Sequence, residues 1–151
     1  MTLAKALANG VPIGAMLCRE EAASVLTAGS HGSTFGGTPF VTQVALATLT
    51  TVIGDKLPER AARMGRELMD GLRALQPAYP VIRQVRGRGL LIGVELSTPA
   101  APIVDACREA GLLVLSAGEK VVRLVPPLIV ESADIRRAID VLNTVLAKVK
   151  A

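Results

Sequence analysis

One lysine near the start of the chain stands in a setting that suits covalent chemistry. Lys5 interrupts an apolar run, residues 2–8 (TLAKALA), which a stretch containing Gly and Pro closes at residues 9–14 (NGVPIG). Small apolar neighbours predict partial desolvation of the amine, which favours its neutral, nucleophilic form. Such an amine can condense with an aldehyde to form a Schiff base. The alternative interpretation is an ordinary solvated lysine on a short helix or loop.

Two further segments carry side chains that suit anion binding. In residues 32–39 (GSTFGGTP), Ser33 and Thr34 lie among glycines, and a loop with little side-chain bulk and many backbone N–H groups lets a phosphate approach closely. In residues 121–128 (VVRLVPPL), Arg123 lies near a strand end before two prolines. A guanidinium can hold a carboxylate through two parallel hydrogen bonds. Ordinary turn chemistry and a surface ion pair are the alternatives for these two segments.

Composition limits the class of protein. The 151 residues are 50% hydrophobic but only 2% aromatic, so a core must be built from Ala, Val, Leu and Ile, which favours α/β layers. The net charge of +4 comes from scattered basic residues with few aromatics between them, so we expect no nucleic-acid binding. We expect no membrane binding either. Cys18 and Cys107 form no C-x-x-C pair and are expected to be reduced, partly buried thiols of a cytoplasmic protein.

The apolar pattern predicts two pieces. Residues 1–54 are predicted to contain a fully buried strand over 11–18, a short helix over 20–26, a loop over 27–39 and a helix over 41–53. This piece is interpreted as the edge of a larger domain built on a parallel sheet.

Residues 55–151 are interpreted as a compact α+β domain. It is predicted to contain helices over 59–76, 102–110 and from Ser132 to Val149, and strands over 81–86, 90–96, 112–115 and 120–125. Ser132 is predicted to be the N-cap of the last helix. The glycines of Arg86-Gly87-Arg88-Gly89 predict a four-residue connection between the first two strands, and both arginines are interpreted as structural.

Four segments resemble, in order and spacing, the class-III aminotransferases, whose fold is the type-I fold of pyridoxal-phosphate enzymes. They are residues 2–15 (TLAKALANGVPIGA), 31–37 (HGSTFGG), 85–95 (VRGRGLLIGVE) and 122–129 (VRLVPPLI). The resemblance covers essentially the whole chain. It implies an α/β fold corresponding to the C-terminal part of such an enzyme. Residues 1–54 would then be the last piece of the large cofactor-binding domain, and residues 55–151 the small C-terminal α+β domain.

The resemblance also implies a role for each candidate residue. Lys5 would bind pyridoxal 5'-phosphate covalently and, once released, move a proton between the substrate carbon and the cofactor. Thr34 would bind the cofactor phosphate in the active site of a neighbouring subunit, which implies a homodimer. Ser33 would lie beside the substrate, and Arg123 would hold a substrate carboxylate. The resemblance implies no metal.

The implied activity is transfer of an ω-amino group from N-acetylornithine to 2-oxoglutarate, in arginine biosynthesis. Ornithine, succinylornithine and 4-aminobutyrate are the alternative donors. The family's acidic partner for the pyridine nitrogen, ring-stacking aromatic, glycine-rich phosphate loop and first substrate arginine would all precede Lys5. The chain is therefore expected to be inactive alone. The alternatives from other classes are a non-catalytic interaction or regulatory module, and a small anion-binding domain.

Overall fold

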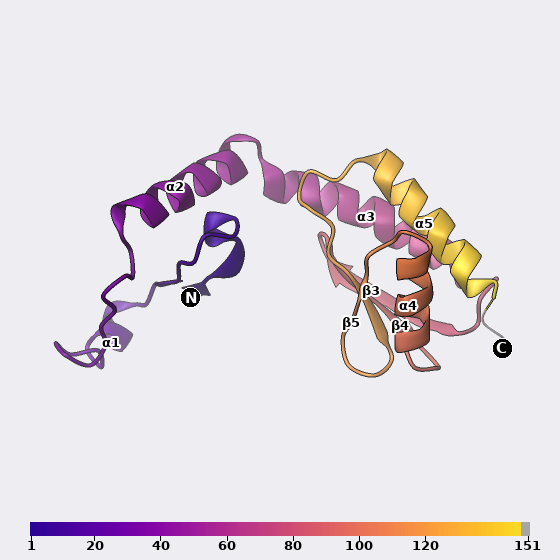
Figure 1. Ribbon diagram of the computed structural model, residues 1–151, viewed down its shortest axis with the longest axis horizontal. Helices are drawn as coiled ribbons and strands as arrows, with labels where there is room; N and C mark the ends of the chain where they lie inside the picture. The colour runs from indigo at the N-terminus through magenta and orange to yellow at the C-terminus, as the bar shows by residue number, and fades with distance from the viewer. Residues whose placement is uncertain (149–151) are drawn as a thin grey trace. The chain divides into compact units, whose positions relative to one another are not determined.

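The computed structural model describes residues 1–148, which form two compact units, Met1–Lys56 and the described part of Leu57–Ala151 (Figure 1). The division predicted after residue 54 lies two residues before the observed one. Among residues 1–148, no helix combines the length and the apolar character needed to cross a bilayer.

The first unit contains little regular structure apart from one helix. Its elements are β1 (Thr2–Leu3), the 3-10 helix η1 (Lys5–Ala8), β2 (Ala15–Met16), α1 (Glu20–Ala23) and α2 (Pro39–Gly54). β1 pairs with β2 in an antiparallel ladder. The prediction of a fully buried strand over 11–18 is wrong, because only Ala15–Met16 is strand and no residue of that segment is buried. A strand buried on both faces needs a sheet with elements packed over both of its faces, whereas the sheet within Met1–Lys56 consists of β1 and β2 alone.

Helix α2 is the main element of this unit. It begins at Pro39, where the missing N–H is tolerated because the first turn has no intrahelical acceptor for it. η1 packs against α2, and Ala8 of η1 is completely buried. On α2 only Ala45 is buried, while Phe40, Leu46 and Ile53 are exposed.

The second unit is a four-stranded antiparallel sheet with a layer of helices. Its elements are α3 (Leu57–Leu75), β3 (Ile82–Arg88), β4 (Leu91–Leu96), α4 (Ala101–Glu109), β5 (Leu115–Ser116), β6 (Val121–Leu124) and α5 (Ser132–Leu146). The strand order is β3-β4-β6-β5. Alternate strand residues such as Ile92, Val94 and Val122 are buried in one core together with residues of α3, α4 and α5. Helices α3 and α5 run side by side (Figure 1).

The connection between β3 and β4 is tighter than predicted. β3 continues through Arg88, so the turn consists of Gly89 and Leu90, and Gly89 has a φ of +55°. Gly87 lies within β3, and a Cβ there would collide with the backbone of Leu91, so this position requires glycine. A Cβ on Gly65 of α3 would likewise collide with the backbone of Gly89, so helix and hairpin are in close contact.

Two other predictions differ from the structure in the second unit. β5 covers Leu115–Ser116 rather than 112–115. The N-cap of α5 is Glu131 rather than Ser132, because the side chains of Glu131 and Asp134 form a reciprocal capping box. The Ser132 hydroxyl instead donates to Glu67 on α3. Val149, predicted as the last apolar residue of this helix, lies outside the described residues.

Candidate functional site

Lys5 has an unusual backbone conformation. Within residues 1–148, three residues other than glycine have a positive φ: Lys5 at 55°, Asn9 at 47° and Lys56 at 51°. Asn9 caps the end of η1, and Lys56 follows the end of α2; left-handed residues are common just after helices. Lys5 instead begins a helix, so this explanation does not apply to it. A lysine held in the left-handed region carries strain of about 1–3 kcal/mol, which is typical of functional positions.

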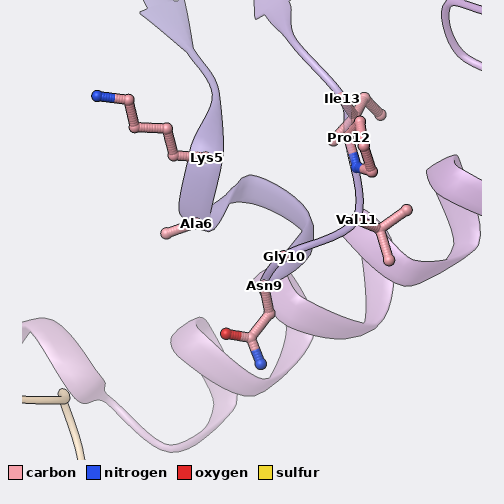
Figure 2. A pocket seen from close by; sticks show the side chains of 7 residues that line it. All are labelled: Lys5, Ala6, Asn9, Gly10, Val11, Pro12 and Ile13. Carbon is pink, nitrogen blue, oxygen red and sulfur yellow. The ribbon is translucent and has the colours of Figure 1, made fainter.

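The side chain of Lys5 is open to solvent. It borders a surface pocket of about 450 Å³ that is also lined by Ala6 and by residues 9–13. Figure 2 shows the amine extending away from Val11 and Pro12. We predicted that apolar neighbours would partly desolvate the Lys5 amine. Lys5 is exposed, so its neighbours among the described residues do not shield it from solvent. Its amine forms no ion pair or hydrogen bond within residues 1–148 and is therefore available to a ligand.

Ser33 and Thr34 lie in an exposed loop before α2. Neither hydroxyl has a hydrogen-bond partner within the described part of the chain. The loop bends tightly, since a Cβ on Gly36 would come 2.8 Å from the Ser33 Oγ and 2.9 Å from its Cβ. Gly37 follows with a φ of +72°. The loop thus presents two free hydroxyls on a glycine turn, which is a chemically suitable arrangement for a phosphate.

Arg123 lies on β6, between Gly93 of β4 and Leu115 of β5. Its neighbours in sequence, Val122 and Leu124, are buried, so alternation places Arg123 on the face of the sheet opposite the core. The Arg123 Nε is buried and has no hydrogen-bond partner among the described residues. A buried donor without a partner is costly, and the Arg60 Nε is in the same state, so this feature is compatible with a ligand at Arg123 but does not single it out.

The four predicted residues are divided between the units. Lys5, Ser33 and Thr34 belong to the first unit, in which no hydrogen bond joins the loop hydroxyls to the lysine. Arg123 belongs to the second unit. No group of three or more His, Cys, Asp or Glu residues within residues 1–148 is arranged to hold a metal ion.

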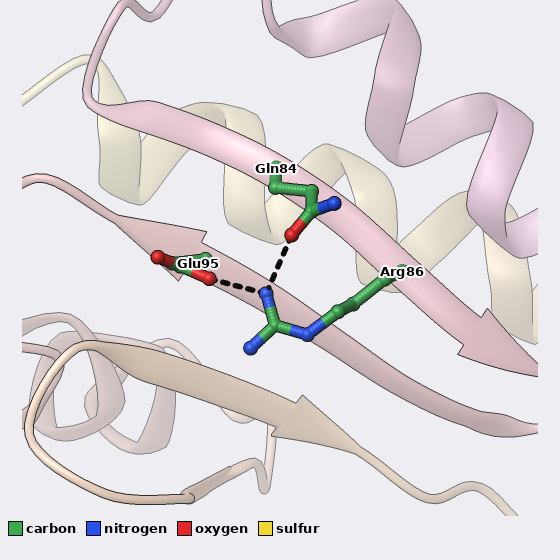
Figure 3. A network of polar contacts seen from close by, with 3 residues as sticks. All are labelled: Gln84, Arg86 and Glu95. Carbon is green, nitrogen blue, oxygen red and sulfur yellow. Dashed lines mark hydrogen bonds and ion pairs between the residues drawn. The ribbon is translucent and has the colours of Figure 1, made fainter.

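Three polar side chains on the same face of the sheet as Arg123 were not assigned a site role from the sequence. Arg86 pairs with Glu95 and donates from Nη1 to the Gln84 Oε1 at 2.9 Å (Figure 3). The alternation of β3 and β4 could have placed these side chains on the same face as Arg123, had the strand register been known.

Arg60 of α3 holds the segment that follows Arg123. Its Nη2 donates to the carbonyls of Ile129 and Val130 at 3.1 and 2.9 Å. No sequence signal indicates a contact between residues so far apart along the chain. The hydrogen bond from Ser132 to Glu67, 2.8 Å long, fixes the same segment at its other end.

The two cysteines differ from the prediction of partly buried thiols. Cys18 is exposed, whereas Cys107 of α4 is fully buried in the core of the second unit. Burial raises the pKa of the Cys107 thiol, because the charged thiolate is poorly solvated there. Cys107 is therefore a core residue that stays protonated at neutral pH.

Comparison with known proteins agrees with the resemblance found in the sequence. The model of the aminotransferase class-III family matches residues 1–146. Acetylornithine aminotransferase of Methanothermobacter thermautotrophicus is 44% identical over 146 residues, which are 97% of this chain and 37% of that protein.

Solved structures give the same result. Ornithine aminotransferase of Toxoplasma gondii matches with a TM-score of 0.88 and 36% identity, over 97% of this chain and 36% of that one. Acetylornithine aminotransferase of Elizabethkingia anophelis matches with a TM-score of 0.88 and 32% identity, over 98% and 40% of the two chains.

The chain belongs to the class-III aminotransferase family, and the predicted α/β fold class is confirmed. It spans about 37% of the length of the curated relatives that it matches.

Proposed function

We propose that this chain provides the reactive lysine and a carboxylate-binding arginine of an aminotransferase that uses pyridoxal 5'-phosphate. The reaction moves the ω-amino group of an amino acid to 2-oxoglutarate. N-acetylornithine is the favoured donor because the similar curated proteins are named acetylornithine aminotransferase. Ornithine, succinylornithine and 4-aminobutyrate are the alternative donors, and arginine biosynthesis is the process that the favoured donor implies.

The backbone conformation of Lys5 is the observation that carries this proposal. Left-handed lysines at helix ends have a structural explanation, but Lys5 stands at a helix start with an amine that has no partner among the described residues. The residues present fit the cofactor, since it requires a free primary amine for its aldehyde and hydroxyl and N–H donors for its phosphate. Lys5 and the loop of Ser33 and Thr34 offer these groups.

Each residue then has a defined task. When bound, pyridoxal phosphate supplies an aldehyde carbon and a ring that withdraws electrons from the substrate. The Lys5 Nζ is the nucleophile toward that aldehyde and, when free, the base that accepts the proton from the substrate carbon. The Arg123 guanidinium binds a carboxylate that the donor and the acceptor share, and its buried Nε supplies one of the donors. Ser33 lies beside the substrate.

The proposal also covers assembly and domain identity. Thr34 binds the cofactor phosphate in the active site of a second subunit, so the working enzyme is a homodimer. Residues 1–54 form the last piece of the large cofactor-binding domain, and residues 55–151 form the small C-terminal domain. The two compact units of the structure support this assignment. The enzyme acts on small molecules in the cytoplasm, without nucleic acid or membrane as partner.

Replacing Lys5 tests the proposal, with Lys56 as a matched control. Both lysines are exposed and have a positive φ, but Lys56 follows the C-terminal end of α2, whereas Lys5 is the first residue of η1. The protein carrying this sequence, at its natural length, is assayed for glutamate formed from N-acetylornithine and 2-oxoglutarate. We expect Lys5→Ala to lower kcat by about 10²–10⁴-fold, since it removes a nucleophile and a base. Lys56→Ala retains normal kcat.

The opposite result would end the proposal. If Lys5→Ala and Lys56→Ala retain the same activity, Lys5 is a surface lysine and its backbone conformation is incidental. Arg123→Lys separates binding from chemistry: we expect a higher KM for 2-oxoglutarate by about tenfold or more, because lysine lacks the planar pair of donors.

A further inference from the structure

The strained backbone of Lys5 lies between two points at which the chain is attached to the rest of its unit. Before Lys5, Leu3 of β1 pairs with Ala15 of β2. After Lys5, η1 packs against α2, and Ala8 of η1 is completely buried. A strained conformation persists only where the surrounding structure holds it. The attachments on either side of Lys5 therefore maintain its φ of +55°.

The attachment to α2 is the stronger of the two. Each strand of the β1–β2 ladder has two residues, none of them buried, and so short a pair of strands is marginally stable in water. The turn of η1, in contrast, is closed by hydrogen bonds from the N–H groups of Leu7 and Asn9 to the carbonyls of Ala4 and Ala6, each 3.2 Å long. Figure 2 shows Lys5 where the chain enters this turn. Because η1 is bonded to itself in this way, burial of Ala8 against α2 fixes the whole turn.

The surface of α2 that receives η1 is a narrow stripe around one alanine. Ala45 is the one buried residue of α2. The half-buried residues of this helix recur at helical spacing on the same face, and they are Val41, Val44, Thr48 and Val52. Leu46 and Ala47, which follow Ala45, are exposed. We infer that Ala8 packs against this stripe near Ala45, where small side chains on both elements let the two backbones approach closely.

We propose that Ala45, together with Ala8, is a positioning residue for Lys5. The contact between η1 and α2 holds Lys5 in its left-handed conformation and thereby aims its amine at the aldehyde of the cofactor. Overpacking a close contact costs a free energy of the same order as the strain of a left-handed lysine, so one larger side chain is enough to release Lys5. The inference rests on the role proposed for Lys5. The two alanines act on the cofactor only through that residue.

Ala45→Leu tests the inference, with Ala47→Leu as the matched control. Both alanines lie on α2, but Ala45 is 7% exposed, whereas Ala47 is on the open side. The protein carrying this sequence, at its natural length, is titrated with pyridoxal phosphate, reduced with borohydride and mapped by peptide mass. We expect Ala45→Leu to weaken cofactor binding about tenfold or more, because small misplacements of a reacting group are costly, and to lower the label on Lys5 relative to that on Lys56. Ala47→Leu should match the wild type.

Two further variants separate positioning from a general loss of stability. Ala45→Ser keeps the side chain small, so the label on Lys5 should be retained. Leu72→Ala destabilises the core of the other unit, so the folded protein should bind the cofactor with unchanged affinity although its unfolding midpoint falls. Urea unfolding followed by circular dichroism gives the folded fraction of each variant.

The outcomes separate this inference from the proposed function. If Ala45→Leu and Ala47→Leu both keep the wild-type label on Lys5, the inference is wrong while the role of Lys5 stands. If Ala45→Leu, Ala45→Ser and Leu72→Ala lose cofactor binding alike, loss of stability explains the effect and the inference is again wrong. If Lys5 takes no label in the wild type, both fall. Should Ala45→Leu not fold, Ala45→Val replaces it, with Ala47→Val as its control.

Discussion

The two units use apolar residues in opposite ways. In the described part of Leu57–Ala151, strands and helices close around one continuous core, and Leu68, Leu72 and Ile92 are at most 2% exposed. In Met1–Lys56, the only buried apolar residues are Ala8 and Ala45, while Phe35 and Phe40 are 84% and 70% exposed.

This difference shows that an apolar pattern predicts burial only where the chain supplies the opposing surface. The second unit contains both layers of its fold, so its pattern and its structure agree. The first unit contains a helix that is apolar on all sides and strands of two residues. It holds Lys5, proposed as the reactive lysine, and the glycine loop, but only two buried apolar residues. We infer that the second unit provides most of the stability.

Truncation of one leucine in each unit should give the largest contrast. Leu72→Ala removes a side chain that is 1% exposed, so we expect the free energy of unfolding to fall by about 2–5 kcal/mol. Leu46→Ala on α2, where the leucine is 56% exposed, should change it by about 0.5 kcal/mol or less. Urea unfolding followed by circular dichroism measures both. Similar losses for the two variants would show that α2 belongs to a core.

After the core leucine, Arg60 should contribute most to the free energy of unfolding. Arg60→Ala removes two hydrogen bonds to the carbonyls of Ile129 and Val130, and we expect a loss of about 1–3 kcal/mol. Arg73→Ala is the control, because Arg73 forms only an exposed pair with Asp70, worth about 0–1 kcal/mol. Equal unfolding midpoints for the two variants would rule out the anchoring role of Arg60.

The smallest expected effect is the pH dependence that the Cys107 thiol gives to the free energy of unfolding. Its pKa is raised in the folded state, so the stability that it contributes is fully present below the ordinary pKa of a thiol. That stability is lost as the pH rises through the raised pKa, because only the unfolded state ionises readily. The wild type should therefore lose more stability between pH 7 and pH 10 than Cys107→Ala.

Thiol reactivity checks the same contrast between the units. Cys18 is exposed and should react with a disulfide reagent at once, whereas Cys107 must wait for local opening. Identical reaction rates at the two cysteines would contradict the burial of Cys107.

The sequence predicted the second unit better than the first, for a physical reason. Helix α3 and strands β4 and β6 have strong apolar periodicity, and their partners lie within about 90 residues of chain, so local pattern and tertiary packing coincide. The prediction of a buried strand over 11–18 is wrong because apolar content alone does not supply the elements that cover both faces of a sheet. The N-cap of α5 was misplaced because Glu131 and Asp134 satisfy each other, which leaves Ser132 free to bind Glu67.

For the candidate site, residue types could be predicted but not their surroundings. The sequence singled out Lys5, Ser33, Thr34 and Arg123, and their roles stay predictions. It could not show that Lys5 is left-handed, because φ at a lysine has no local sequence signal. Arg86 was interpreted as structural from the sequence. Only the strand register shows that Arg86, Gly93 and Arg123 are cross-strand neighbours on β3, β4 and β6.

The central claim is that Lys5 is the amine that binds the cofactor. It is tested most directly by loading the protein carrying this sequence, at its natural length, with pyridoxal phosphate and reducing the carbon–nitrogen double bond with borohydride. Peptide mass mapping then locates the label. The account predicts the pyridoxyl group on the peptide that contains Lys5, with little on that of Lys56. A label spread evenly over the exposed lysines, or absent from Lys5, would contradict it.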